Sequence, residues 1–417
     1  MGMIINIDEA LKLRSDYNIL REPLNEMLKN TQEAWERENP VDYLFTRGTI
    51  STFQESYCSS IGFAHAFSET GDYSIGPIFN TAEGFSATYR TRTFQGGFII
   101  TQQTLEDRQL RKAKDDASAF IKRWHGDIVE YCITSISGGF GNEVTWGSDA
   151  NGGKSRIKLT SADTTDGDVN TPTKNPLFSK NHTIVKRDTM TAAEINAAKQ
   201  SNIFRAAVDL TNTDTSAPFV IGGSDPAQIA KLADVIYQVI VEMENYRDDN
   251  NKRAGVLGQK TIVAGNDAHL SAALNAAVSS ETFGNMPNSA YKKATVKTTP
   301  YLNDIPQCAK GKGFFIVDKA YNAENHGPEV TERIAFTLDV NQTKRPNGIT
   351  YDGRQRFDIN VASWRGIVYV MLDAPETTDA TAWNHVSKFT PIVPVATLVK
   401  PVTIVGDVST SGTTSGN

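Results

Sequence analysis

The hydrophobic and polar positions of the chain follow a two-residue period before residue 95 and a helical period after residue 104. In the first part Phe85, Ala87 and Tyr89 alternate with polar residues, which is typical of a strand with one covered face. The polar link 81–84 contains a glycine where a turn needs one. The pattern predicts a two-stranded hairpin with the arms Gly71–Asn80 and Phe85–Phe94. Because an isolated hairpin is marginal in water, we expect it to lie on another surface.

The helical period predicts one long helix over Thr104–Ser137. Thr104 is a suitable N-cap, acidic residues occupy the first turn, and Gly138-Gly139 ends the pattern. At 1.5 Å per residue the helix would be about 50 Å long, which is unusual for a globular domain. Its apolar residues recur every three or four positions and form one stripe: Leu110, Ala113, Ala117, Ile121, Trp124, Ile128, Cys132 and Ile136.

The later part of the chain predicts a mixed α/β region. Ser224-Asp225-Pro226 is expected to open a second long helix, which ends within Asn250–Gly255. A strand at Thr261–Ala264 precedes a helix capped by Asn266 or Asp267 that continues to about Val278. The apolar stripe of the second long helix is Ile229, Leu232, Ala233, Ile236, Val239, Ile240 and Met243. Further strands are predicted over Lys293–Thr299, Gly313–Asp318, Glu332–Val340 and Phe357–Leu372, with turns at Asn347-Gly348 and Asp352-Gly353.

The remaining segments carry weaker patterns. Residues 1–60 are interpreted as an arm that does not fold by itself, with a helix over Pro23–Trp35, and the pattern is irregular from Ile50 to Phe67. Residues 140–176 have the composition of surface loops, and Thr191–Glu194 is a capping box that opens a short helix. Thr390–Val405 is expected to add strands, and Asp407–Asn417 is expected to be a flexible tail.

Composition and charge exclude several classes of protein. The 417 residues are 39% hydrophobic and 22% charged, which fits a folded soluble protein with more than one domain. A net charge of −6 argues against a dedicated nucleic-acid binder. The three cysteines have no metal-ligand spacing, and we expect buried thiols in a reducing compartment. No apolar run has the length of a signal peptide core or a membrane span, so we expect a soluble protein without membrane contact.

Candidate catalytic chemistry is weak throughout the sequence. The six histidines are scattered without a paired motif, and Gly138–Gly141 follows a predicted helix instead of a strand. The segment 255–261 lacks the spacing of a phosphate loop, and Asp248–Asn251 lacks that of a calcium loop. We therefore predict that the chain is not an enzyme and has no catalytic, cofactor-binding or metal-binding residues.

The order of these elements resembles the major capsid proteins of tailed double-stranded-DNA bacteriophages, which have the Hong Kong 97-type capsid fold. The resemblance covers about residues 1–376. It is carried by four segments: Phe98–Thr101 followed by Leu105-Glu106-Asp107, Pro176–His182, Gly313–Asp318 followed by Tyr321, and Asp352-Gly353 through Arg365-Gly366-Ile367.

The resemblance implies an α+β fold that is divided along the chain. It implies an N-terminal arm (1–60), an extended hairpin loop (61–100) and a peripheral domain (101–220) with a spine helix (104–137) and a loop insertion. An apical α/β domain (221–310), return strands (311–376) and a C-terminal extension with a flexible tail (377–417) follow.

The implied function is structural: self-assembly, through pentamers and hexamers, into an icosahedral shell around phage DNA. The virion is the expected location, after assembly in the host bacterial cytoplasm. The expected partners are other copies, a separate scaffolding protein, a portal, weakly contacted double-stranded DNA and, in addition, a decoration protein. The candidate intersubunit contacts are Tyr73, Ile75, Phe79, Phe85, Tyr89, Arg90, Arg92, Arg108 and Arg111.

One departure from the family pattern changes an expectation. Some members join their subunits by an isopeptide bond from a hairpin lysine, but Gly62–Thr104 contains no lysine. We therefore expect no crosslink by that route. Two alternatives stay open at this point: an encapsulin-like compartment that holds a cargo protein, and an α/β enzyme of unknown activity.

Overall fold

The structure is a computed structural model that describes residues 30, 35, 39–60, 83–101, 103, 110–141, 144–146, 155–157, 159–166, 173–182, 199–207, 226–248, 252–283, 286–344 and 347–373. The helices are α2 (Val41–Leu44), α4 (Leu110–Ser137), α6 (Pro226–Asn245), α7 (Ala268–Ser279) and α8 (Lys319–Glu324), with 3₁₀ turns at Gly138–Phe140, Pro300–Asp304 and Ala309–Gly311. The strands up to the middle of the chain are β1 (Thr46–Thr49), β2 (Gln54–Ser60), β3 (Glu83–Arg90), β4 (Arg92–Thr101), β5 (Val144–Trp146), β6 (Ser155–Ile157), β7 (Thr160–Asp166), β8 (Thr173–Pro176) and β9 (Ile203–Ala207). The later strands are β10 (Lys260–Gly265), β11 (Thr282–Phe283), β12 (Met286–Pro287), β13 (Ala294–Thr299), β14 (Gly313–Asp318), β15 (Glu329–Lys344), β16 (Asn347–Asn360) and β17 (Ile367–Asp373).

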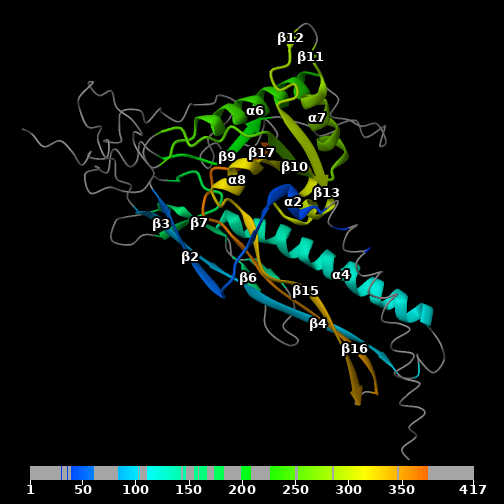
Figure 1. The fold of residues 1–417 in the computed structure, drawn as a ribbon. Helices are drawn as coiled ribbons and strands as arrows, with labels where there is room; N and C mark the ends of the chain where they lie inside the picture. Colours follow the sequence, from blue (N-terminus) through cyan, green and yellow to red (C-terminus); the bar gives the residue numbers. More distant parts are fainter. Residues whose placement is uncertain are drawn as a thin grey trace, which may run out of the picture.

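A five-stranded sheet in the order β13-β10-β14-β17-β9 forms the centre of the α/β body. The pairs β10–β13 and β17–β9 are parallel, and β14 pairs antiparallel with both of its neighbours. In Figure 1, α6 and α7 lie above this sheet, and α2 and α4 lie below it. All six residues of β14 are buried, as expected for a central strand that is covered on both faces.

A second sheet, in the order β1-β15-β16-β4, extends away from the α/β body. Its three long strands run beside α4 toward the lower right of Figure 1, whereas β2 and β3 run toward the upper left. Residues of β16 alternate between buried and exposed positions, because α4 covers one face of the sheet. This sheet and α4 together form a two-layer extension.

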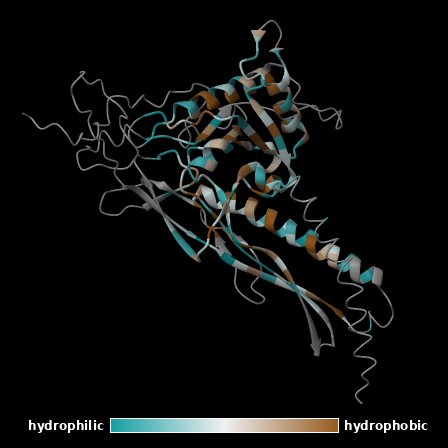
Figure 2. Cartoon of the chain, in the orientation of Figure 1, coloured by the Kyte–Doolittle hydropathy of each residue, from teal (hydrophilic) through white to brown (hydrophobic). Residues whose placement is uncertain are grey.

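The helix α4 belongs to both parts of the molecule. The described members of its predicted stripe are buried or half-buried, and its last turns enter the same core cluster as α6, α7 and the five-stranded sheet. Figure 2 shows hydrophobic and hydrophilic segments alternating along this helix. The long helix and its end at Ser137 are confirmed, while the predicted cap Thr104 lies outside the described residues.

Several other predictions are confirmed by the α/β body. The seven predicted apolar residues of α6 are all buried, although the helix ends at Asn245, earlier than expected. The strand Gly313–Asp318 has the predicted bounds. Asp267 caps α7, because its side chain accepts hydrogen bonds from the backbone N–H groups of His269 and Leu270. Cys132 and Cys308 are buried free thiols.

The structure describes one arm of the predicted hairpin, and Glu83 and Gly84 of the predicted turn belong to its strand β3. Gly71–Asn80 lies outside the described residues, and the partner of β3 is β2, in a segment that the sequence left irregular. Gln54, Glu55 and Ser56 are all exposed, so β2 has no two-residue hydrophobic period to detect. The predicted strand Phe85–Phe94 is divided at the buried Thr91, because β3 pairs with β2 and β4 pairs with β16.

Four further segments differ from their predictions. Asp352-Gly353 lies inside β16, where a glycine leaves room for the rings of Phe336 and Phe120. The predicted strand Phe357–Leu372 is interrupted between Asn360 and Ile367. Within the predicted loops 140–176, β5 pairs with β6 and β7 with β8. The N-terminal arm is partly integrated, because Leu44 and Phe45 are core residues and β1 pairs with β15.

The α/β body contains a fully buried ion pair that supplies the first testable prediction. Lys260 Nζ lies 2.8 Å from Asp318 Oδ2, and the two side chains are 2% and 0% exposed. Replacing Lys260 by Met leaves a carboxylate buried without its counter-charge, so we expect a loss of about 3–5 kcal/mol in the free energy of unfolding. Urea unfolding of the purified protein measures this loss. The double variant Lys260→Met/Asp318→Asn is the control and should recover part of it; equal stability of wild type and Lys260→Met would contradict the prediction.

A buried histidine supplies the second prediction. His182 is fully buried, stacks on Trp364 with ring centroids 4.1 Å apart, and lies 3.0 Å from Asn202 Oδ1 through Nε2. Burial, which outweighs the hydrogen bond to Asn202, lowers the pKa of His182 to about 3. An unfolded histidine has a pKa of about 6.5, so the unfolded state binds more protons between these two values. Stability should therefore fall as pH drops from about 6.5 toward 3.

The measurement for His182 is the free energy of unfolding at a series of pH values. His182→Phe keeps an aromatic ring beside Trp364 and should remove a slope of up to about 1.4 kcal/mol per pH unit in this range. The partly exposed His269 provides the matched control variant, His269→Phe. An unchanged slope in His182→Phe would show that other groups cause the acid sensitivity.

Candidate assembly surface

The contact between α4 and the extended sheet is built from aromatic rings. Phe94 of β4 stacks on Phe357 of β16 with centroids 4.7 Å apart, and both rings contact Tyr131 of α4 edge-on. Farther along, Phe98 stacks on Tyr351 at 4.8 Å and also contacts Phe120 of α4. Aromatic pairs of this kind stabilise the contact beyond the area that they bury. The sheet is therefore held firmly against the helix along the extension.

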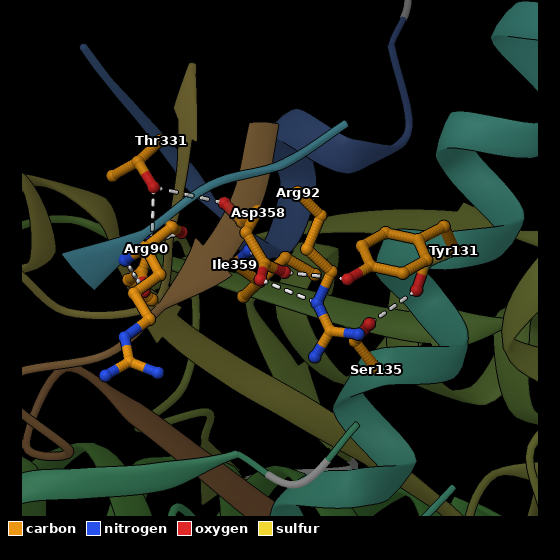
Figure 3. A network of polar contacts seen from close by, with 8 residues as sticks. Arg90, Arg92, Tyr131, Ser135, Thr331, Asp358 and Ile359 are labelled. Atoms are coloured by element: carbon orange, nitrogen blue, oxygen red, sulfur yellow. Dashed lines mark hydrogen bonds and ion pairs between the residues drawn. The ribbon is translucent and has the colours of Figure 1, made fainter. Parts of the chain in front are cut away.

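A polar network lies where the β2–β3 ribbon (residues 54–60 and 83–90) leaves the extended sheet (Figure 3). Its centre is Asp358 of β16. The carboxylate of Asp358 accepts hydrogen bonds from Tyr131 Oη at 2.7 Å and from the backbone N–H of Ile359 at 2.8 Å. It also accepts one from Arg92 Nε at 2.9 Å. One side chain of β16 thus connects α4 and β4.

The same network continues to the start of the ribbon. Asn360 exchanges hydrogen bonds with the backbone of Arg90, its amide also donates to Thr331 Oγ1, and the Thr331 hydroxyl donates to the Asp358 carbonyl at 3.2 Å. Arg90 Nε donates to Gln54 Oε1 of β2 at 3.1 Å. Figure 3 shows Arg90, Thr331, Asp358, Arg92 and Tyr131 in one connected group. The direction of the ribbon is therefore tied to the helix through side chains.

The electrostatics of the network favour its present protonation states. Burial, followed by the nearby Asp358 carboxylate, raises the pKa of Tyr131 far above its usual value, so its hydroxyl remains a donor. Burial disfavours the charge of Arg92, but the Asp358 carboxylate outweighs it and raises the pKa of that guanidinium. The network is a neutral phenol beside an ion pair, which is an arrangement suited to holding position and not to proton transfer.

The predicted intersubunit candidates are distributed unevenly over this region. Tyr73, Ile75, Phe79 and Arg108 lie outside the described residues, while Phe85 lies in β3 and Arg111 in α4. Tyr89 is buried beside Ala87 and Ala362, and its ring contacts His326. Arg90 is exposed. The structure brings Tyr89, Arg90 and Arg92 together at the base of the ribbon, where contacts within the chain hold each of them.

Sequence reasoning missed the residues that organise this site. Asp358 and Asn360 lie on β16, more than 200 residues after Tyr131, and no short motif joins them to it. The one available signal was Tyr131 itself. It stands between apolar residues of the helical stripe, where a phenol needs a polar partner once it is buried.

The described residues contain neither a metal-binding cluster nor a membrane-spanning helix. Within the part of the chain that the structure describes, no group of three or more His, Cys, Asp or Glu residues is placed to hold a metal ion. None of the described helices is long and apolar enough to cross a membrane.

Comparisons with known proteins give structural neighbours only. No family model matches the chain, and no curated protein matches it. The solved capsid structure of the cyanophage P-SCSP1u has a TM-score of 0.41 and 9% identity, over 79% of this chain and 86% of that one. The chain is similar to virus capsid subunits. A solved structure of Mycobacterium phage Patience gives a TM-score of 0.42 and 12% identity over 87% and 88% of the two chains. The crystal structure of a virus-like particle from Pyrococcus furiosus gives a TM-score of 0.38 and 10% identity, over 85% of this chain and 98% of that one.

The network around Asp358 supplies the third prediction. In Asp358→Asn the new amide group faces Arg92 Nε, so two donors oppose each other and the ion pair is lost. We expect a loss of about 2 kcal/mol in the free energy of unfolding and faster amide hydrogen exchange in residues 54–60 and 83–90. Arg123→Gln is the control. It breaks an exposed pair with Asp127 on the outer face of α4 and should cost less than about 0.5 kcal/mol. Unchanged exchange in the ribbon would show that the network does not fix it.

Proposed function

We propose that this chain is the major capsid protein of a tailed double-stranded-DNA bacteriophage and assembles into the icosahedral shell that encloses the genome. The observation that supports it best is the shape of the subunit. A single core carries a long two-layer extension on one side and a two-stranded ribbon on the other (Figure 1). Arms of this kind have little use in a compact enzyme, but they provide separate contact surfaces for neighbouring copies.

The stability of the ribbon supports the same proposal. Among the described residues β2 and β3 form a two-stranded pair; residues 54–56 are exposed, while Ala87 and Tyr89 are buried within the chain. A two-stranded ribbon of this kind is marginal in water without further cover. In a shell that cover comes from neighbouring subunits. The contact residues predicted from the sequence stay our proposal: Tyr73, Ile75, Phe79, Phe85, Tyr89, Arg90, Arg92, Arg108 and Arg111.

The partners follow from this function. Copies of the chain assemble into pentamers and hexamers, with a scaffolding protein and a portal as separate chains. The net charge of −6 suits a container that holds DNA by weak, non-specific contact. The mature location is the virion, after assembly in the cytoplasm of the host bacterium. A decoration protein is a further proposed partner. The role is structural, without a catalytic activity of its own.

The test is negative-stain electron microscopy with light scattering on the full chain, expressed alone and together with a scaffolding protein from the same genome. We expect closed shells, or rings of five and six subunits. A species that stays a monomer of 45.6 kDa or a dimer even with the scaffold would contradict the proposal. Shells that contain a single cargo protein in place of nucleic acid would favour the encapsulin-like alternative.

A further inference from the structure

The described part of the chain leaves four large apolar side chains exposed, namely Phe53, Tyr237, Leu257 and Met286. Leu257 is 69% exposed and lies in the loop between α6 and β10. A single exposed leucine is ordinary on a protein surface. What distinguishes Leu257 is how firmly the residues on either side of it are held.

Lys260 holds the backbone of the loop around Leu257 through hydrogen bonds. Its ammonium group donates to the carbonyl oxygens of Val256 at 2.9 Å and of Gly258 at 2.8 Å, which are the two neighbours of Leu257. Val256 is fully buried. A Cβ atom on Gly258 would come within 2.3 Å of Asp318 Oδ1, so the backbone there approaches the buried ion pair closely. The loop therefore presents Leu257 to solvent on a rigid base.

A buried ion pair contributes little net free energy to holding a loop. The desolvation of Lys260 and Asp318 offsets much of their attraction, and apolar pairs of similar volume are often equally stable. What the ammonium adds is the ability to hold two backbone carbonyls in one geometry. Presenting an apolar side chain in a fixed position lowers the entropy lost when a partner binds it. Such anchors contribute most to interfaces.

Charge around Leu257 indicates the kind of partner. The same loop contains Lys252 and Arg253, whose side chains are exposed. Asp248 is half-buried and accepts the backbone N–H of Lys252 at 2.8 Å. Two exposed cations thus lie four and five residues before the exposed Leu257 in the same loop, and this combination fits a partner surface that is apolar with acidic residues beside it.

The same chain carries such a surface on α6. Asp234, Tyr237, Val241 and Glu244 are spaced so that they share one face of this helix. Tyr237 is 38% exposed at its centre, and Asp234 and Glu244 lie on either side along the helix. The neighbouring Glu242 is half-buried, and burial raises its pKa. Lys231 is the one cation on the described part of this helix, and it lies one turn before Asp234.

We propose that Leu257 of one copy packs on the Tyr237 face of α6 in a second copy, with Lys252 and Arg253 facing Asp234 and Glu244. The two surfaces differ, so the contact is heterologous and can close into rings. This inference rests on the proposed function and names one contact by which the subunits of the shell recognise each other. The long-range attraction between the rims also favours the correct orientation during encounter.

The test is a disulfide trap between copies. In assembled Leu257→Cys/Tyr237→Cys, oxidation should give a ladder of multimers on a non-reducing denaturing gel. Of the three native cysteines, Cys132 and Cys308 are buried and do not compete, and the single variants below control for disulfides through Cys58. Met286→Cys/Tyr237→Cys is the matched control, because Met286 is 75% exposed but lies on β12, and it should give no ladder. The single variants should stay monomeric on the gel.

A second measurement uses the concentration at which assembly begins. Leu257→Ser should raise it about tenfold or more without changing the melting temperature of the subunit, since the side chain is exposed. Lys252→Glu should also raise it, and adding Asp234→Lys should restore part of the loss. This inference would be overturned if the wild type forms shells, the double-cysteine variant shows no disulfide ladder and Leu257→Ser assembles normally. The proposed function would then remain intact. Failure of the wild type to assemble with its scaffold would overturn both.

Discussion

The burial of α4 against two different surfaces is the interaction on which the other contacts depend. Its last turn, which includes Ile136, belongs to the core of the α/β body, while Phe120, Trp124 and Tyr131 contact the extended sheet. A helix of 28 residues is a rod about 40 Å long. Without it the sheet would expose the rings of Phe94, Phe98 and Phe357 to water, and the extension would have no fixed direction.

Polar residues determine how the segments join. Asp358 connects β16 with α4 and β4, and Asn202 connects two other segments through hydrogen bonds to the backbones of Leu177 and Ser179 and to that of Ile367. Apolar contacts tolerate small rotations, but a buried polar group that loses its partner is costly. These residues therefore fix the relative orientation of the strands and helices that they connect, whereas the hydrophobic core only keeps those elements in contact. In a shell subunit the angles between arms decide whether neighbouring copies meet in the right orientation.

The sequence predicts best the elements whose burial is regular. The stripe from Ile229 to Met243 and the strand Gly313–Asp318 are recognisable because one face, or both faces, are apolar. The strand β2 has polar residues at 54–56 and forms through backbone pairing with β3, which leaves no hydrophobic period. Gly353 was interpreted as a turn because nothing in the sequence reveals the rings of Phe336 and Phe120 that need the space.

The candidate site was only partly predictable for a related reason. The sequence identifies Arg90 and Arg92 as charges beside a strand, but a charge alone does not reveal whether its partner is Asp358 of the same chain or a residue of another copy. That choice depends on which distant strands become neighbours. The loop of Leu257 illustrates the same limit, because its rigidity comes from Lys260 paired with Asp318, which lies 61 residues after Leu257. An exposed apolar residue becomes informative only when the structure shows that buried charge holds it in place, since rigid presentation is what distinguishes a contact residue from an ordinary exposed leucine.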